Sequence, residues 1–137
     1  MNKAQNKHGK VTSPEGFFGF KLGADRKIAR WDKIVDYFHK IESESDKIKV
    51  VDMGKSTEGR PFLLTVISSA QNLERLEHYK SINAQISDPR GLTEGAVKQL
   101  VEEGKAVVCQ TMSLHATEIG GTQMAPELAY DLLSSDS

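Results

Sequence analysis

The chain has 137 residues, of which 38% are hydrophobic and 27% are charged, and its net charge is −1. This length fits a single domain with a sizeable core, and the near-neutral balance gives no basis for binding nucleic acid or an anionic membrane surface. No apolar run approaches the roughly 18 residues of a membrane-spanning helix.

The first 15 residues are polar and rich in Lys, Asn and Gln, which predicts a flexible lead-in before a domain covering residues 16–137. They contain no apolar run typical of a signal peptide, and the cellular compartment stays open. We expect the aromatic residues 17–23 (FFGFKLG) to form a loop that packs on the domain.

Four segments carry apolar side chains at helical spacing. The predicted helices cover residues 28–41, 72–86, 93–103 and 119–133. Gly104 follows the third helix as a C-terminal cap, and Pro126 is tolerable in the fourth only near its first turn.

Three segments are typical of strands. Residues 47–53 and 63–68 flank a turn-rich connector, residues 54–61, which predicts a hairpin. Residues 106–112 form a near-continuous apolar run, which predicts a third strand buried on both faces. Cys109, the only cysteine, lies in this run. It is interpreted as a small core residue rather than a nucleophile, and a single thiol does not identify the redox compartment.

These elements predict an α/β fold with a mixed sheet flanked by helices. Three strands make a poor sheet, and no strand follows the last helix, so we expect only the N-terminal part of such a domain to be present. An open sheet edge would predispose the chain to self-association.

The residues that point to chemistry are His115 and Glu118, between the third predicted strand and the last helix. An imidazole and a carboxylate three residues apart at the C-terminal edge of a strand can both reach one metal ion. The same spacing recurs at His39 and Glu42, inside the first predicted helix, where such a pair is an ordinary surface contact.

A hydrolytic zinc site commonly has three protein ligands and a water molecule. The only other histidines besides His39 are His8 and His78, and neither follows a predicted buried strand. We therefore expect the third ligand of this site to be missing from the chain.

The order of these features resembles the zinc carboxypeptidases of the carboxypeptidase A type. The matching motifs are the G-x-S-x-E-G-R-P turn at residues 54–61, the strand ending in ISS at residues 67–69, and H-x-x-E after a strand at residues 115–118. The FFGF, NL-x-x-L…YK, DPRGLTE and LHATE segments are similar to a long bacterial subgroup, and the likeness extends from about Pro14 onward.

The resemblance implies that His115 and Glu118 bind one zinc ion and that a zinc-activated water hydrolyses the C-terminal peptide bond of a peptide or protein substrate. In the family, the third zinc ligand, the general base and the residues that bind the substrate carboxylate lie further along the chain. None of these has a counterpart here, so the resemblance implies no catalytic residue within this chain and little or no turnover by it alone.

Three further positions are interpreted from the same likeness. Thr117 stands where pancreatic-type members carry an arginine, and it cannot supply that charge. Arg60 is interpreted as a surface residue of the turn. Residues 71–104 look like an insertion relative to the compact pancreatic enzymes.

Two alternatives remain open. A related zinc-dependent acyl-amino-acid deacylase also uses an H-x-x-E pair, although the EGRP turn favours the peptidase. A non-catalytic remnant or binding protein would keep the fold and lack the rest of the site.

Overall fold

The computed structural model describes residues 10–115 and 117–135, which combine helices with one small antiparallel sheet. In chain order the elements are α1 (Pro14–Phe18), α2 (Trp31–Glu44), β1 (Ile48–Lys55), β2 (Pro61–Ile67), α3 (Ala70–Glu74), α4 (Leu76–Ser87), α5 (Glu94–Glu103) and α6 (Ile119–Ser134).

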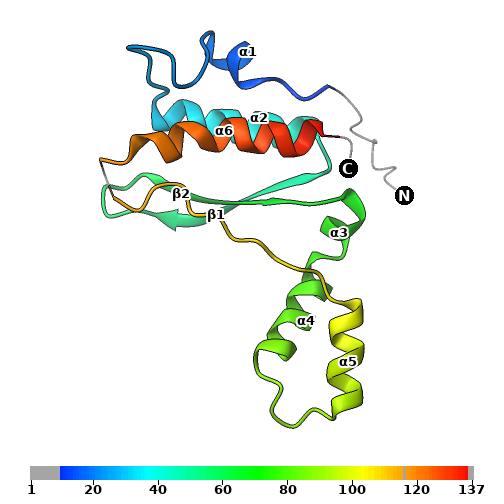
Figure 1. The fold of residues 1–137 in the computed structure, drawn as a ribbon. Helices are drawn as coiled ribbons and strands as arrows, with labels where there is room; N and C mark the ends of the chain where they lie inside the picture. The colour runs from blue at the N-terminus through cyan, green and yellow to red at the C-terminus, as the bar shows by residue number, and fades with distance from the viewer. Residues whose placement is uncertain (1–9, 116, 136–137) are drawn as a thin grey trace.

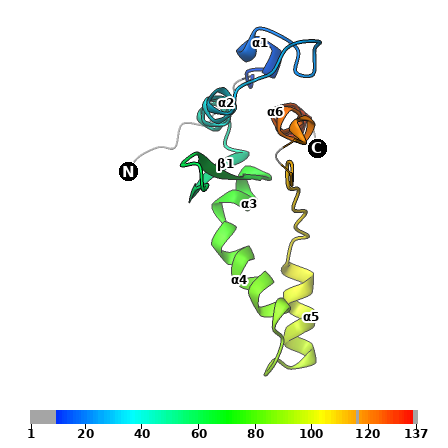
Figure 2. The same ribbon diagram turned by 90° about the vertical axis from the view of Figure 1, so that its left-hand side faces the viewer.

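The main core lies between two helices and the hairpin. Helices α2 and α6 run side by side over one face of the β1–β2 hairpin, as both ribbon views show (Figures 1 and 2). The apolar stripe predicted for the first helix is the buried face of α2, which contributes Ile34, Tyr37, Phe38 and Ile41 to this core. Helix α6 contributes Ala129 and Leu133.

The hairpin confirms the prediction for residues 47–68. The strands pair antiparallel, with Ile48 opposite Ile67 and Val50 opposite Thr65. The connector closes through a hydrogen bond of 2.8 Å from the Ser56 amide to the Arg60 carbonyl. Gly59 supplies the positive φ of 71° that this turn requires.

The segment before α2 packs on the core. Ser13 caps α1, and Phe17 and Phe18 pack their rings against Tyr37. Val11 is also buried, so packing begins before residue 16. Residues 1–9 of the predicted lead-in lie outside the described residues.

Helices α3, α4 and α5 form an arm that extends away from the hairpin (Figures 1 and 2). The single helix predicted for residues 72–86 is divided at Arg75, whose backbone leaves helical geometry at φ −103° and ψ 19°. Helix α5 confirms the prediction for residues 93–103. The Thr93 hydroxyl caps its first turn by accepting the Ala96 amide.

The third predicted strand is wrong. Residues 104–111 have no regular secondary structure, and residues 105–113 make no backbone–backbone hydrogen bond within the described part of the chain. Val107 and Val108 are 72% and 90% exposed, and Cys109 is exposed rather than in the core. A strand forms only where another strand pairs with its amides and carbonyls, and β1 and β2 pair only with each other.

The position of Pro126 within α6 differs from the prediction. The proline is fully buried in the interior of the helix rather than in its first turn. The Thr122 carbonyl therefore lacks the amide partner that a helix normally provides. No helix in the described residues is both long and apolar enough to cross a membrane.

Candidate metal centre

The structure brings His115 and Glu118 together immediately before α6. Glu118 is the N-cap residue of that helix, and its amide donates to the His115 carbonyl over 3.1 Å. This turn places the His115 Nδ1 atom 2.7 Å from the Glu118 Oε1 atom. Both side chains face solvent, with exposed fractions of 68% for His115 and 52% for Glu118.

The Glu118 carboxylate also organises the loop that precedes it. Its Oε2 atom accepts the His115 amide at 3.0 Å and the Leu114 amide at 3.4 Å. The hydrogen bond from the His115 ring is the largest of the effects that hold the pKa of Glu118 below its ordinary value, and the two amides act in the same direction. Glu118 is therefore ionised at neutral pH and able to act as a metal ligand.

The donor types of this pair fit zinc, but their number does not complete a zinc site. Zinc accepts an imidazole nitrogen and a carboxylate oxygen, and Nδ1 is the ring atom of His115 that faces Glu118. Within the described ranges, no group of three or more His, Cys, Asp or Glu side chains could hold a metal ion. Ligation by His115 and Glu118 stays a prediction.

The second H-x-x-E copy has a structural role. His39 Nδ1 lies 3.6 Å from Glu42 Oε2 on α2, in the i,i+3 geometry expected for a surface contact. Glu42 Oε1 accepts the Val50 amide at 2.7 Å, which joins the end of α2 to β1. This carboxylate is already used in packing the helix on the hairpin.

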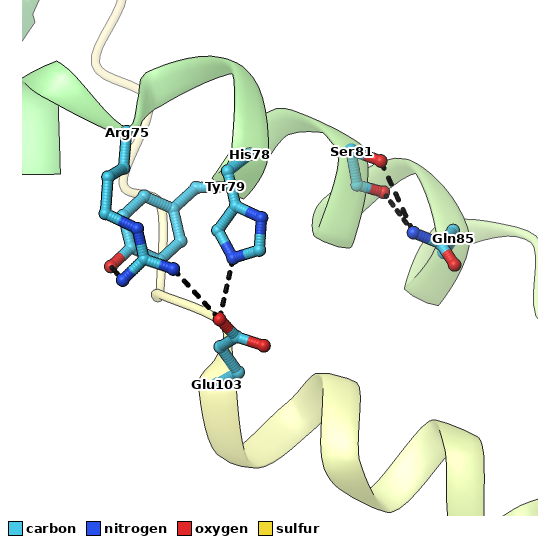
Figure 3. Close-up of polar contacts among 6 residues, drawn as sticks. All are labelled: Arg75, His78, Tyr79, Ser81, Gln85 and Glu103. Atoms are coloured by element: carbon cyan, nitrogen blue, oxygen red, sulfur yellow. Dashed lines mark hydrogen bonds and ion pairs between the residues drawn. The ribbon is translucent and has the colours of Figure 1, made fainter.

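A third histidine–carboxylate contact lies at the base of the arm, where α4 begins and α5 ends (Figure 3). Glu103 Oε1 lies 2.7 Å from His78 Nε2 and 3.0 Å from an Arg75 guanidinium nitrogen. Tyr79 stacks beside Arg75, with the guanidinium carbon 5.2 Å from the ring centroid. Sequence reasoning missed this cluster because 25 residues separate His78 from Glu103.

The cluster around Glu103 joins the start of α4 to the end of α5. One carboxylate oxygen is shared between a cation and an imidazole, and these hydrogen bonds lower the pKa of Glu103. The only signal available in the sequence was the pair of adjacent amphipathic segments, which suit an antiparallel helix pair. His8 lies outside the described residues.

Among the described residues, no hydrogen bond or ion pair joins the side chain of Arg60 or Thr117 to His115 or Glu118. Arg60 is exposed in the hairpin turn, where its backbone closes the turn, in keeping with a surface role. Thr117 is exposed as well.

Comparison with known proteins gives one match. The sequence model of a family described as zinc carboxypeptidase matches residues 34–137, which include the hairpin turn, His115 and Glu118. A search of the curated proteins finds no match, and a search of the solved structures finds none either.

Proposed function

Because the chain belongs to the zinc carboxypeptidase family, we propose that His115 and Glu118 are two ligands of a catalytic zinc ion in a metallocarboxypeptidase domain. The observation that carries the proposal is the 2.7 Å contact between the His115 ring and the Glu118 carboxylate inside the matched region. An imidazole and a carboxylate held this close can turn their donor atoms to a common ion.

Each residue of the loop has a definite part in this proposal. The Leu114 and His115 amides hold Oε2 of Glu118, which leaves Oε1 directed at Nδ1 of His115. Ionised Glu118 supplies negative charge, and His115 supplies a ring nitrogen, whose hydrogen bond to Oε1 a bound ion would replace. Zinc, when bound, lowers the pKa of a water molecule and polarises the scissile carbonyl.

The proposal requires groups in addition to those that the structure describes. A third zinc ligand, a general base and a group that binds the substrate carboxylate must come from other residues of the complete site. The substrate we propose is the C-terminus of a peptide or protein. On this view the 137 residues bind zinc weakly and do not hydrolyse peptides without the missing groups.

The test is zinc titration calorimetry on the chain and on the His115→Ala and Glu118→Ala variants. We expect each substitution to weaken zinc binding by more than about tenfold. Even the loss of a residue that only hydrogen-bonds to a metal ligand weakens binding by about that factor. The matched controls are His39→Ala and His78→Ala, which break the other two histidine–carboxylate contacts. Zinc binding that His78→Ala reduces as strongly as His115→Ala would contradict the assignment.

A second candidate function has one observation in its favour. Within the described residues, no group of three or more His, Cys, Asp or Glu side chains could hold a metal ion, as would also be expected of a family member that keeps the fold without catalysis. Hydrolysis of C-terminal residues by the complete polypeptide, abolished by His115→Ala, would exclude this non-catalytic alternative. Inactivity of the complete polypeptide with zinc present would support it.

A further inference from the structure

The backbone of Ser113 crosses the first turn of α6 at Gly121, which is the third residue of that helix. A Cβ atom added to Gly121 would lie 2.9 Å from the Ser113 nitrogen and 3.5 Å from the Met112 carbonyl carbon. The closer separation is shorter than real Cβ atoms tolerate, and both neighbours are backbone atoms that no side-chain rotation can move away. Glycine is therefore required for the crossing as it stands.

The crossing coincides with a sharp change in chain direction. Ser113 adopts a φ of 78°, a left-handed conformation that a serine occupies only when its surroundings hold it there. Its hydroxyl donates to the His115 carbonyl over 2.9 Å. Directly after this residue, the Leu114 and His115 amides both point to the Glu118 carboxylate.

We propose that Gly121 is a positioning residue for the His115–Glu118 pair. The missing side chain lets Ser113 lie against α6, and the turn at Ser113 then presents the His115 ring to Glu118. The adjacent glycine provides a natural contrast, because a Cβ atom at Gly120 would meet nothing within 4 Å. Only the zinc-binding consequence rests on the proposed function, since the loop geometry exists without the ion.

The experiment compares Gly121→Ala with the matched control Gly120→Ala. Amide hydrogen exchange of Leu114 and His115, together with nuclear Overhauser contacts between the His115 ring and Glu118, is measured by NMR without zinc. We expect Gly121→Ala to accelerate both amides by about tenfold, the equivalent of one lost hydrogen bond, and to abolish the ring contact. Gly120→Ala is expected to keep both signals. Zinc titration calorimetry then measures how strongly the same variants bind zinc.

A further variant, Ser113→Ala, removes only the hydroxyl bond and is expected to give a smaller acceleration at the same amides. Equal exchange in Gly121→Ala and Gly120→Ala would overturn the proposal. Loss of helical circular dichroism in Gly121→Ala would also overturn it, because the glycine would then support the whole fold rather than the pair. If the expected NMR changes occur while no variant binds zinc, the positioning role stands and the proposed metal function fails.

Discussion

Glu44 joins the segment that precedes α1 to the end of α2. Its carboxylate accepts the Thr12 amide at 2.9 Å and the Thr12 hydroxyl at 2.8 Å, and Lys40 lies 2.7 Å away. Desolvation alone would raise the pKa of Glu44, but the hydrogen bonds from Lys40 and Thr12 outweigh it and hold the pKa below its ordinary value. The side chain is only 19% exposed, so solvent screens these contacts weakly.

We predict that Glu44→Gln lowers the free energy of unfolding by about 1–2 kcal/mol at pH 7, the range for hydrogen bonds to a charged group. A pKa lowered by folding contributes stability above the ordinary value of 4.5, and this contribution is lost as the pH falls below it. The difference between the variant and the parent should therefore shrink at pH 3. Urea denaturation at both pH values measures this.

The control for Glu44→Gln is Asp36→Asn, which breaks an exposed ion pair with Lys33 on the same helix. Solvent screens an exposed pair of this kind, so we expect the smaller effect. A loss in Glu44→Gln that persists unchanged at pH 3 would contradict the electrostatic explanation.

The candidate metal pair could be proposed at the residue scale because its signal is local. His115 and Glu118 are three residues apart in the turn that precedes α6, so the sequence spacing alone indicates that their side chains can meet. The contact between His78 and Glu103 depends on how α4 packs against α5, and no local spacing carries that information. The close approach of Gly121 to Ser113 could not be predicted from spacing either, because it occurs where Ser113 has a positive φ.

At the scale of elements, amphipathic periodicity identified α2, α4, α5 and α6. In α2 the apolar residues form one buried stripe, from Ile34 to Ile41. The residues at which the helices begin and end depend on capping groups, which hydrophobic periodicity does not indicate. Ser69 starts α3 by accepting the Asn72 amide, and the helix then stops at Arg75. The strand predicted at residues 106–112 fails because apolar composition shows a need for burial, whereas a strand also needs a pairing partner.

Helix α6 is joined to the segment before α2 by the side chain of Gln123. Its amide accepts the Ala29 amide at 2.8 Å and donates to the Ala29 carbonyl at 2.9 Å, and Ala29 is buried. We predict that Gln123→Ala lowers the free energy of unfolding by about 2 kcal/mol, because a buried donor and acceptor lose their partner. Urea denaturation followed by circular dichroism gives the value.

The matched control is Gln85→Ala on α4, where the amide donates to Ser81 on the exposed surface (Figure 3). Water replaces those contacts at little cost, so we expect a change within about 0.5 kcal/mol. An equal decrease in the free energy of unfolding in the two variants would contradict a stabilising role for the hydrogen bonds between Gln123 and Ala29.

At the scale of the whole molecule, apolar side chains remain exposed in several regions, among them the hairpin and the segment that precedes α6. On β1 and β2, Met53 and Phe62 are each more than half exposed, although the opposite face of the hairpin lies on the core. Residues 106–112 add a run without regular secondary structure or backbone–backbone hydrogen bonds, in which the Gln110 side chain donates to the Thr111 carbonyl. Exposed apolar surface and unpaired strand-like backbone both favour association with further polypeptide.

We predict that the 137-residue chain self-associates through residues 106–112 and that Val108→Lys reduces this association. A charged side chain at a position that is 90% exposed disturbs no packing, and it opposes close approach of a second strand. Sedimentation velocity over a range of protein concentrations measures the change. Val101→Lys, at a 60% exposed position on α5, adds the same charge elsewhere and should leave association unaltered. A reduction of similar size in both variants would assign the effect to net charge, and a parent chain that is monomeric throughout would contradict the prediction.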